Sequence, residues 1–184
     1  MKPFYSIAPA QPIHLKELAG IELSAAIRLK GYAPVSVLAE TTPEQEFYAA
    51  QEAGRLWVAL ADEIPVGFAL VEILDQDHPH LQEMDVVPEH GCRGLGSSLL
   101  RTVLEWTRCS GYEEITLTTF RAIPWNMPFY SQLGFEEIPA DELRTELKSI
   151  VQDEAKRGLD PNERVVMRCR VNRSMFYTKY ISQS

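Results

Sequence analysis

The chain has 184 residues, of which 45% are hydrophobic and 24% charged, and its formal net charge is −8 at pH 7. This length accommodates one domain with a developed hydrophobic core and is too short for two ordinary ones, so we expect residues 1–184 to form a single domain. Because the Lys and Arg residues are scattered, the acidic balance excludes a general nucleic-acid surface and favours a cationic small molecule as partner.

The N-terminal part of the chain is predicted to be helical. Apolar residues recur at mixed three- and four-residue spacing over residues 13–30, which predicts a helix with one apolar face. Residues 42–45, Thr-Pro-Glu-Gln, have the form of a capping box with proline at the first helical position, and Gly54 can adopt the left-handed conformation that ends a helix. We therefore expect a second, short helix between these signals.

Strands and helices follow in the rest of the chain. β-rich runs at 56–61 and 66–74 flank a polar segment that is typical of a hairpin turn, and a third strand is expected at about 80–87. The later patterns predict a helix at 97–109, a strand at 115–120, a short helix at 126–133, an inserted amphipathic helix at 141–158, a last strand at 164–170 and a tail at about 172–184. This order favours an α/β fold in which a mixed sheet is covered by helices.

A glycine-rich loop joins the third strand to the helix at 97–109. Its glycines, Gly91, Gly94 and Gly96, let the backbone approach an anion, and the helix N-terminus favours negative charge, so a pyrophosphate fits there. The order G-x-x-G-x-G differs from the dinucleotide-binding G-x-G-x-x-G, and Ser97 stands where a P-loop has its Lys. A plain glycine turn is the structural alternative.

The loop resembles the coenzyme A loop of the GNAT family of acyl-CoA N-acyltransferases, whose pattern is Arg or Gln, two residues, Gly, one residue, Gly or Ala. The match is carried by residues 93–96, Arg-Gly-Leu-Gly, and by the Val-x-Pro before them. The usual Arg/Gln position holds Gly91, so a charge contact would have to come from Arg93 or elsewhere. The resemblance implies a mostly antiparallel central sheet with helices on both faces, and a coenzyme A site at Val86, Val87, Gly91, Cys92, Arg93, Gly94, Leu95, Gly96 and Ser97.

A second segment, residues 125–135, resembles a shortened form of the family's Asn-x-x-Ala-x-x-Phe-Tyr-x-x-x-Gly-Phe helix. The resemblance implies that Asn126 and Phe129 contact coenzyme A and that Tyr130 lies near the thioester sulfur, where it donates a proton or a hydrogen bond to the departing thiolate. The structural alternative is that the aromatic residues only fill the core. Tyr130 differs from the phenylalanines because a buried hydroxyl needs a partner.

An amine acceptor must lose a proton before it can attack an acyl group. A lysine-like amine has a pKa of about 10.4, so it is protonated at pH 7 and requires a base. His80 and Glu83 precede the glycine loop, and we place His80 slightly ahead because its usual pKa is nearer neutrality. Strict alternation along a strand puts the two on opposite faces unless a bulge intervenes. A solvated histidine and a salt-bridged glutamate are the structural alternatives.

The cysteines Cys92, Cys109 and Cys169 show no CxxC or Cys/His spacing, so neither a disulfide framework nor a metal site is expected. The start of the chain lacks the apolar core of a signal peptide, and no apolar run approaches a bilayer-spanning length. We therefore expect a cytoplasmic protein without a membrane partner.

Together these motifs predict an N-acetyltransferase. Acetyl-CoA would act as co-substrate without a metal, and the acetyl group would pass directly to a primary amine of a small molecule or peptide in a ternary complex. The alternative is a non-catalytic acyl-CoA-binding regulatory or interaction domain with the same fold. The acceptor's identity is open, as is the pairing of two copies of the chain into a homodimer.

Overall fold

The computed structural model describes residues 3–75 and 77–171, and the expected tail at 172–184 lies outside the described residues. Within them the chain forms a seven-stranded sheet in the order β1-β2-β3-β4-β5-β7-β6. The strands are β1 Tyr5–Pro9, β2 Leu56–Ala61, β3 Ile64–Leu74, β4 His78–Val86, β5 Glu114–Phe120, β6 Glu136–Glu137 and β7 Arg164–Arg170. The α-helices are α1 Leu15–Ala26, α2 Val35–Leu38, α3 Glu44–Glu52, α4 Leu95–Cys109, α5 Met127–Gln132 and α6 Thr145–Lys156.

The sheet is mixed and mostly antiparallel, as the sequence predicts. The β2–β3 hairpin turns at Asp62 and Glu63, whose φ angles of 46° and 71° are those of a tight turn that matches the twist of its strands. The pairs β1·β2, β2·β3, β3·β4, β5·β7 and β6·β7 are all antiparallel. Strand β1, strand β6 and the short helix α2 were not predicted, because each is too short to give a periodic signal.

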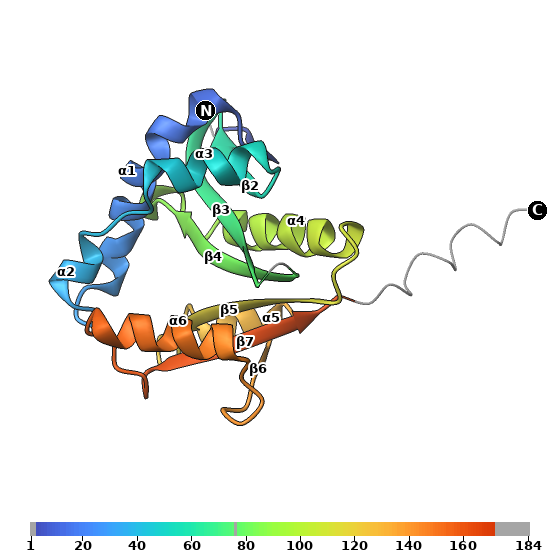
Figure 1. Ribbon diagram of the computed structural model, residues 1–184. Coiled ribbons are helices and arrows are strands. Elements are labelled where there is room, and N and C mark those ends of the chain that lie inside the picture. Colours follow the sequence, from blue (N-terminus) through green and yellow to red (C-terminus); the bar gives the residue numbers. More distant parts are fainter. Residues whose placement is uncertain (1–2, 76, 172–184) are drawn as a thin grey trace, which may run out of the picture.

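Strands β4 and β5 form the parallel pair of this sheet, and they are joined over a short stretch. Only His80 with Thr116 and Leu81 with Leu117 are in register within the described residues. Beyond these pairs the two strands separate, so the sheet divides into a β1–β4 half and a β5–β7 half (Figure 1). Beyond the paired residues, residues 82–86 of β4 are half-buried rather than buried.

Strand β4 contains a β-bulge beside its partner β3. Leu70 pairs with Glu83 and Val71 pairs with Leu81, so Gln82 is an extra residue without a counterpart. Because side chains alternate along a strand, one extra residue reverses the faces of everything that follows. His80 and Glu83 therefore lie on the same face, which is the outcome that the sequence left open for a strand with a bulge.

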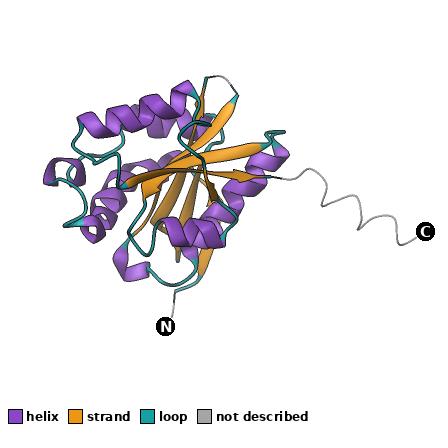
Figure 2. Ribbon diagram, turned by 90° about the horizontal axis from the view of Figure 1, so that it is seen from below, coloured by secondary structure: helices purple, strands orange, loops and turns teal. Residues whose placement is uncertain are grey.

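Helices cover both faces of the sheet (Figure 2). On one face, helices α1 and α3 pack over β2 and β3, with Leu18, Phe47 and Phe68 fully buried. On the other face, α4 packs with Leu99, Leu100 and Val103 on β3, β4 and β5, and residues of α5 pack beside it. Helix α6 lies against the β5–β7 half, where Leu147 contacts Val166 of β7. The residues on either side of Val166 pack on the α4 side, so Val166 and α6 are on the opposite face. Helices α1, α3 and α6 thus share one face, and α4 and α5 share the other.

Two local expectations were wrong. Thr42 does not cap helix α3, because its hydroxyl and its backbone amide donate to the carboxylate of Glu22, and Pro43 is the N-cap residue rather than the first helical one. The helix expected from residue 141 begins at Thr145, and its charges are not all solvated, since Glu154 is buried. The pattern contained the signal, because Leu147, Ile150, Val151 and Glu154 fall on one helical stripe.

Candidate active site

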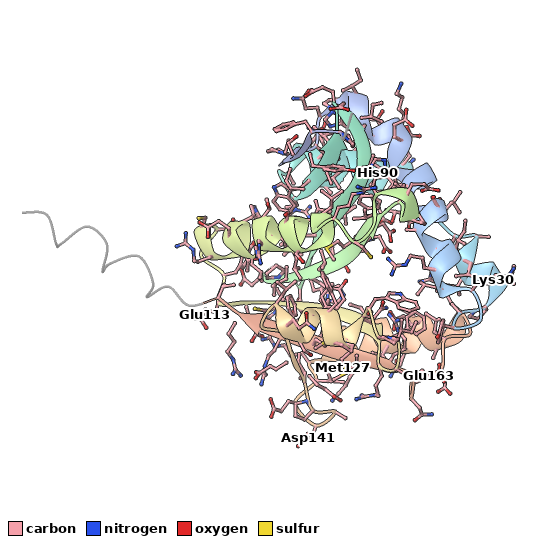
Figure 3. All side chains as sticks on the ribbon, turned by 180° about the vertical axis from the view of Figure 1, so that it is seen from behind. Lys30, His90, Glu113, Met127, Asp141 and Glu163 are labelled. Atoms are coloured by element: carbon pink, nitrogen blue, oxygen red, sulfur yellow. The ribbon has the colours of Figure 1, made fainter. Side chains whose placement is uncertain are left out.

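A cavity of about 510 Å³ occupies the place where β4 and β5 separate. Its walls include every residue of β4 from Leu81 to Val86 and every residue of β5 from Leu117 to Phe120. Successive side chains of a strand point to opposite faces, and these runs are continuous, so the cavity reaches both faces of the sheet. The remaining walls come from the glycine loop, from α5 and the residues before it, from the segment between the end of α1 and α2, from the end of α6 and the turn after it, and from Arg164 of β7. Figure 3 shows His90, which lines the cavity, and Met127, at the start of α5, on opposite halves of the fold.

The glycine loop lies on the α4 side of this cavity. Gly94 is the N-cap of α4 with φ of +80°, and Cys92 is also left-handed, with φ of 55°. The first-turn amides of Leu95, Gly96 and Ser97 have no acceptor within the helix, as in any α-helix. A Cβ at Gly96 would lie 3.6 Å from the ring of Phe129, so α5 closely approaches the loop. Free amides, a helix N-terminus and small side chains therefore meet at one end of the cavity.

Most of the residues predicted for the coenzyme line the cavity, and two do not. The lining residues are Val86, Gly91, Cys92, Gly94, Leu95, Gly96, Ser97, Asn126 and Phe129. Val87 instead donates its amide to the Val66 carbonyl at 2.9 Å. Arg93 is exposed, and its guanidinium lies 5.9 Å from the centre of the Tyr5 ring. The structure thus places neither Val87 nor Arg93 in the cavity wall. Arg93 therefore does not contribute its positive charge to the part of the loop that lines the cavity.

Tyr130 lines the cavity from α5. Its ring packs edge-on against Phe129 and Phe135, with centroid distances of 5.1 and 5.8 Å. Burial raises the pKa of the Tyr130 hydroxyl above its usual value, and the nearby carboxylates of Glu83 and Asp85 raise it further. The hydroxyl is therefore neutral at physiological pH and is available as a hydrogen-bond donor.

Glu83 and Asp85 lie side by side on β4 and line the same cavity. They point to the α1 face, because Glu83 pairs with Leu70 and Asp85 with Phe68, both of which pack under α1. Burial raises the pKa of Glu83 to about 7, with a smaller contribution from the charge of Glu22. Burial and the Glu83 charge raise the pKa of Asp85 well above its usual range, and the two side chains share a hydrogen bond. This pair can hold a proton near neutrality.

His80 lies outside the cavity wall. Its side chain is 2% exposed, and its Nδ1 is hydrogen-bonded to the Thr116 hydroxyl at 2.8 Å. Burial lowers the pKa of the imidazole to about 4. The structure therefore brings Glu83 and Tyr130 together at the cavity and places His80 outside its wall, while the choice of base between His80 and Glu83 stays a prediction.

A second cavity of about 400 Å³ adjoins the first on the α1 face. The two share six lining residues, which are Leu29, Val37, Gln82, Glu83, Asp85 and Arg157. Its own walls add the carboxylates of Glu22, Glu40 and Glu46. Arg157 forms an ion pair with Glu40. Carboxylates therefore outnumber cations around this second cavity.

Sequence reasoning missed a buried ion pair in the cavity wall. The guanidinium of Arg164, at the start of β7, binds both oxygens of Glu154 on α6, with Nε at 2.9 Å from Oε2 and Nη2 at 2.6 Å from Oε1. Thr118 of β5 donates its hydroxyl to the same carboxylate at 2.8 Å. Glu154 lies on the apolar stripe of its helix, the one signal that could have revealed it.

The described residues contain neither a candidate metal site nor a candidate membrane-spanning helix. In residues 3–75 and 77–171, no group of three or more His, Cys, Asp and Glu side chains is arranged to hold a metal ion. Over the same residues, no helix combines the length and the apolar character that crossing a membrane requires.

Comparison with known sequences connects the chain to acetyltransferases. The family described as "Acetyltransferase (GNAT) family" matches residues 21–135. Human N-acetyltransferase 8 and N-acetyltransferase 8B are 29% and 30% identical to the chain over 113 residues, which make up 58% of this chain. The chain spans about half the length of these curated relatives, since the match covers 49% of each.

Comparison with solved structures identifies the same fold. PaiA N-acetyltransferase from Thermoplasma acidophilum, in complex with coenzyme A, superposes with a TM-score of 0.70 at 17% identity, over 91% of this chain and 99% of that one. N-acetylglutamate synthase from Neisseria gonorrhoeae, complexed with coenzyme A and N-acetyl-glutamate, superposes with a TM-score of 0.68 at 16% identity. That likeness covers 94% of this chain and 36% of the synthase. At such identities the shared feature is the fold.

Proposed function

Because the chain belongs to the GNAT acetyltransferase family, we propose that it transfers an acetyl group from acetyl-CoA directly to a primary amine, with both substrates bound at the same time. The observation that carries this proposal is the cavity between β4 and β5. A glycine loop whose free amides suit an anion lies on one face of the sheet, and on the other face lies a carboxyl pair in which the pKa of Glu83 is about 7. Donor and acceptor can therefore enter from opposite faces and meet between the strands.

The donor end would hold coenzyme A mainly through the backbone. The amides at the start of α4 and the left-handed residues Cys92 and Gly94 suit a pyrophosphate. The exposed edge of β4 at Val86 has backbone groups for the amide-containing pantetheine arm, while Asn126 and Phe129 would contact it from α5. This arrangement fits coenzyme A without Arg93, which lies outside the cavity wall.

Glu83 would act as the general base at the acceptor end. An alkylammonium with a pKa of about 10.4 must lose a proton before its nitrogen can attack, and a base with a pKa near the working pH is the most effective acceptor. The Glu83–Asp85 pair meets this requirement because burial raises the pKa of Glu83 to about 7. The neutral amine then forms a bond to the thioester carbonyl carbon, and the carbon–sulfur bond breaks.

Tyr130 would assist the departure of the thiolate. Because burial raises its pKa, complete proton transfer to a thiolate is less favourable than for an exposed phenol. A hydrogen bond that strengthens as negative charge develops on sulfur needs no complete transfer. After the attack the nitrogen loses its second proton, which passes to the departing thiolate through Tyr130 or through solvent. The products are the amide and the free thiol of coenzyme A, and the Glu83 proton passes to solvent.

A panel of amines tests this function directly. The purified chain is mixed with acetyl-CoA and with n-butylamine, 1,4-diaminobutane, lysine amide or a short peptide, and thiol release is followed against hydrolysis without amine. Amine-dependent thiol release together with the mass of the acetylated product is the expected result. Binding of coenzyme A by calorimetry without release for any amine would instead identify the non-catalytic acyl-CoA-binding domain.

A further inference from the structure

The buried pair of Arg164 and Glu154 is unusual for its position. Its side chains are only 9% and 10% exposed, yet both residues line the cavity in which the transfer is proposed. The guanidinium also lies over the ring of Phe120, 4.5 Å from its centroid. Charged side chains are seldom buried to this extent without a partner, and removing one partner leaves an uncompensated charge.

The pair joins three elements around the acceptor end. Arg164 begins β7, Glu154 lies in the last turns of α6, and Thr118 of β5 binds the Glu154 carboxylate. The contacts fix the last part of α6, and Arg157 and Leu159, which follow the helix, complete the wall. Because both Nε and Nη2 of Arg164 donate to the Glu154 carboxylate, the orientation of the planar guanidinium is fixed as well.

The charges that act on Glu83 come from several elements. Asp85 lies beside it on β4, and Glu22 of α1 adds a second negative charge. Tyr130 of α5 is neutral, and Arg157 of α6, which borders both cavities, is paired with Glu40. Arg164 is the cation whose charge favours the ionised form of Glu83, and it acts in the same direction on Tyr130. Glu154 therefore orients a cation toward the carboxylates of this site.

We propose that Arg164 is a positioning residue for the acetyl transfer, held in the cavity wall by its two contacts with Glu154 so that a fixed positive charge stands at the acceptor end with the Glu83–Asp85 pair. This inference rests on the proposed function in one respect, the role of Glu83 as base. The effect of the Arg164 charge on the carboxyl pair does not depend on whether the protein transfers an acetyl group. Without the guanidinium, the pair retains its proton to higher pH and less base is available at pH 7.

The first test is a carboxyl titration that needs no acceptor. The protein is labelled with ¹³C-glutamate, the Glu83 carboxyl signal is assigned by its loss in Glu83→Gln, and its shift is followed from pH 4 to 9. In the double variant Glu154→Gln/Arg164→Gln, which leaves no unpaired buried charge, the midpoint should rise by about one pH unit. Arg164→Lys keeps the charge and should titrate like the wild type. An unchanged midpoint in the double variant overturns the proposal.

A second variant separates charge from mere packing. Glu154→Gln removes the carboxylate but keeps the guanidinium, so the midpoint of Glu83 should fall or stay constant, opposite to the double variant. If the role were only to hold α6, both variants would move the titration in the same direction. Lys156→Gln removes an exposed ion pair with Asp153 on the same helix and is the matched control, with no expected change. Thermal melting and coenzyme A binding verify the fold of each protein.

The kinetic test uses acetyl-CoA with the best amine of the panel. The acidic limb of kcat/KM should move upward by the same amount as the Glu83 midpoint in the double variant and should return to its wild-type position in Arg164→Lys. If wild-type protein transfers no acetyl group to any amine, the proposed function fails while the titration still decides the role of Arg164. If transfer occurs and neither the limb nor the midpoint moves, the positioning role is wrong.

Discussion

The two ends of the cavity are built in different ways. On the α4 side the wall consists of a contiguous loop with small side chains and amides at a helix N-terminus. On the α1–α6 side it includes charged side chains from α1, β4, α6 and β7, which are separate segments of the sequence. A backbone site depends on local conformation, whereas a side-chain site depends on the assembled fold. Mutations at the two ends should therefore fail in different ways.

The largest effect is expected at the acceptor end from Glu83→Gln. Loss of the base should lower kcat/KM by about 10² to 10⁴, while the affinity for coenzyme A stays unchanged. Under the proposed mechanism the active form is the carboxylate, so activity of the wild type should rise with pH through about 7 and level off above it. The variant should lack this step, which is measured as kcat/KM from pH 5 to 9. A retained step would mean that another group is the base.

The donor end should respond most to Gly94→Val. The residue has φ of +80°, where a β-branched side chain is strained, and it lines the cavity. We expect coenzyme A affinity to fall by about 10²-fold, as measured by calorimetry. Gly54→Val is the matched control, because Gly54 is also left-handed, with φ of +67°, and lies outside the cavity. Equal loss of affinity in both would indicate general destabilisation rather than a coenzyme site.

Between the two ends, Tyr130→Phe should lower kcat by about tenfold to a hundredfold and leave coenzyme A binding nearly intact. The ring contacts with Phe129 and Phe135 remain, so only the hydroxyl is tested. Single-turnover kinetics verify that chemistry limits the rate. Wild-type kcat under that condition would show that the hydroxyl is not involved.

A smaller effect is expected from the charge of the acceptor. Because Glu22, Glu40 and Glu46 border the cavity beside Glu83, a second ammonium group should be attracted. We expect 1,4-diaminobutane to have a KM several-fold lower than n-butylamine at low salt, with the ratio shrinking as salt screens the charges. A ratio that does not depend on salt would argue against this attraction.

The smallest effect on rate is expected at His80, where the consequence is for stability. Its pKa of about 4 lies below the usual 6.5, so the folded state favours the neutral imidazole. The stability due to this group is complete above pH 6.5 and is lost as the pH falls toward 4, by up to about 3 kcal/mol. His80→Gln should flatten the unfolding free energy over this range and leave the kinetic step near pH 7 in place. Loss of that step would restore His80 as the base.

The sequence revealed one end of the cavity better than the other. Glycines at Gly91, Gly94 and Gly96 are needed for backbone conformation and close approach, so they leave a pattern in consecutive residues. The partnership of Arg164 with Glu154 arises only when α6 docks on the sheet, and neither residue predicts the other. The preference for His80 over Glu83 followed from usual pKa values, which burial shifts in opposite directions for an imidazole and a carboxyl.

The fold was predicted in the same uneven way. Hairpin and helix periodicity identified β2, β3, α4 and β7, whose patterns are long and regular. The two-residue β6 and the edge strand β1 depend on pairing with distant strands, for which a local pattern contains no information.

The extra residue in β4 makes strand length a determinant of chemistry. A chain that lacked only Gln82 would keep Glu83, Asp85 and every other side chain of the site, but alternation would turn the carboxyl pair toward α4 or turn His80 away from Thr116. Such a deletion would damage the site more than most substitutions within it. Engineered variants of this strand, including grafts onto other scaffolds, should therefore first preserve the bulge and only then the identity of the individual residues.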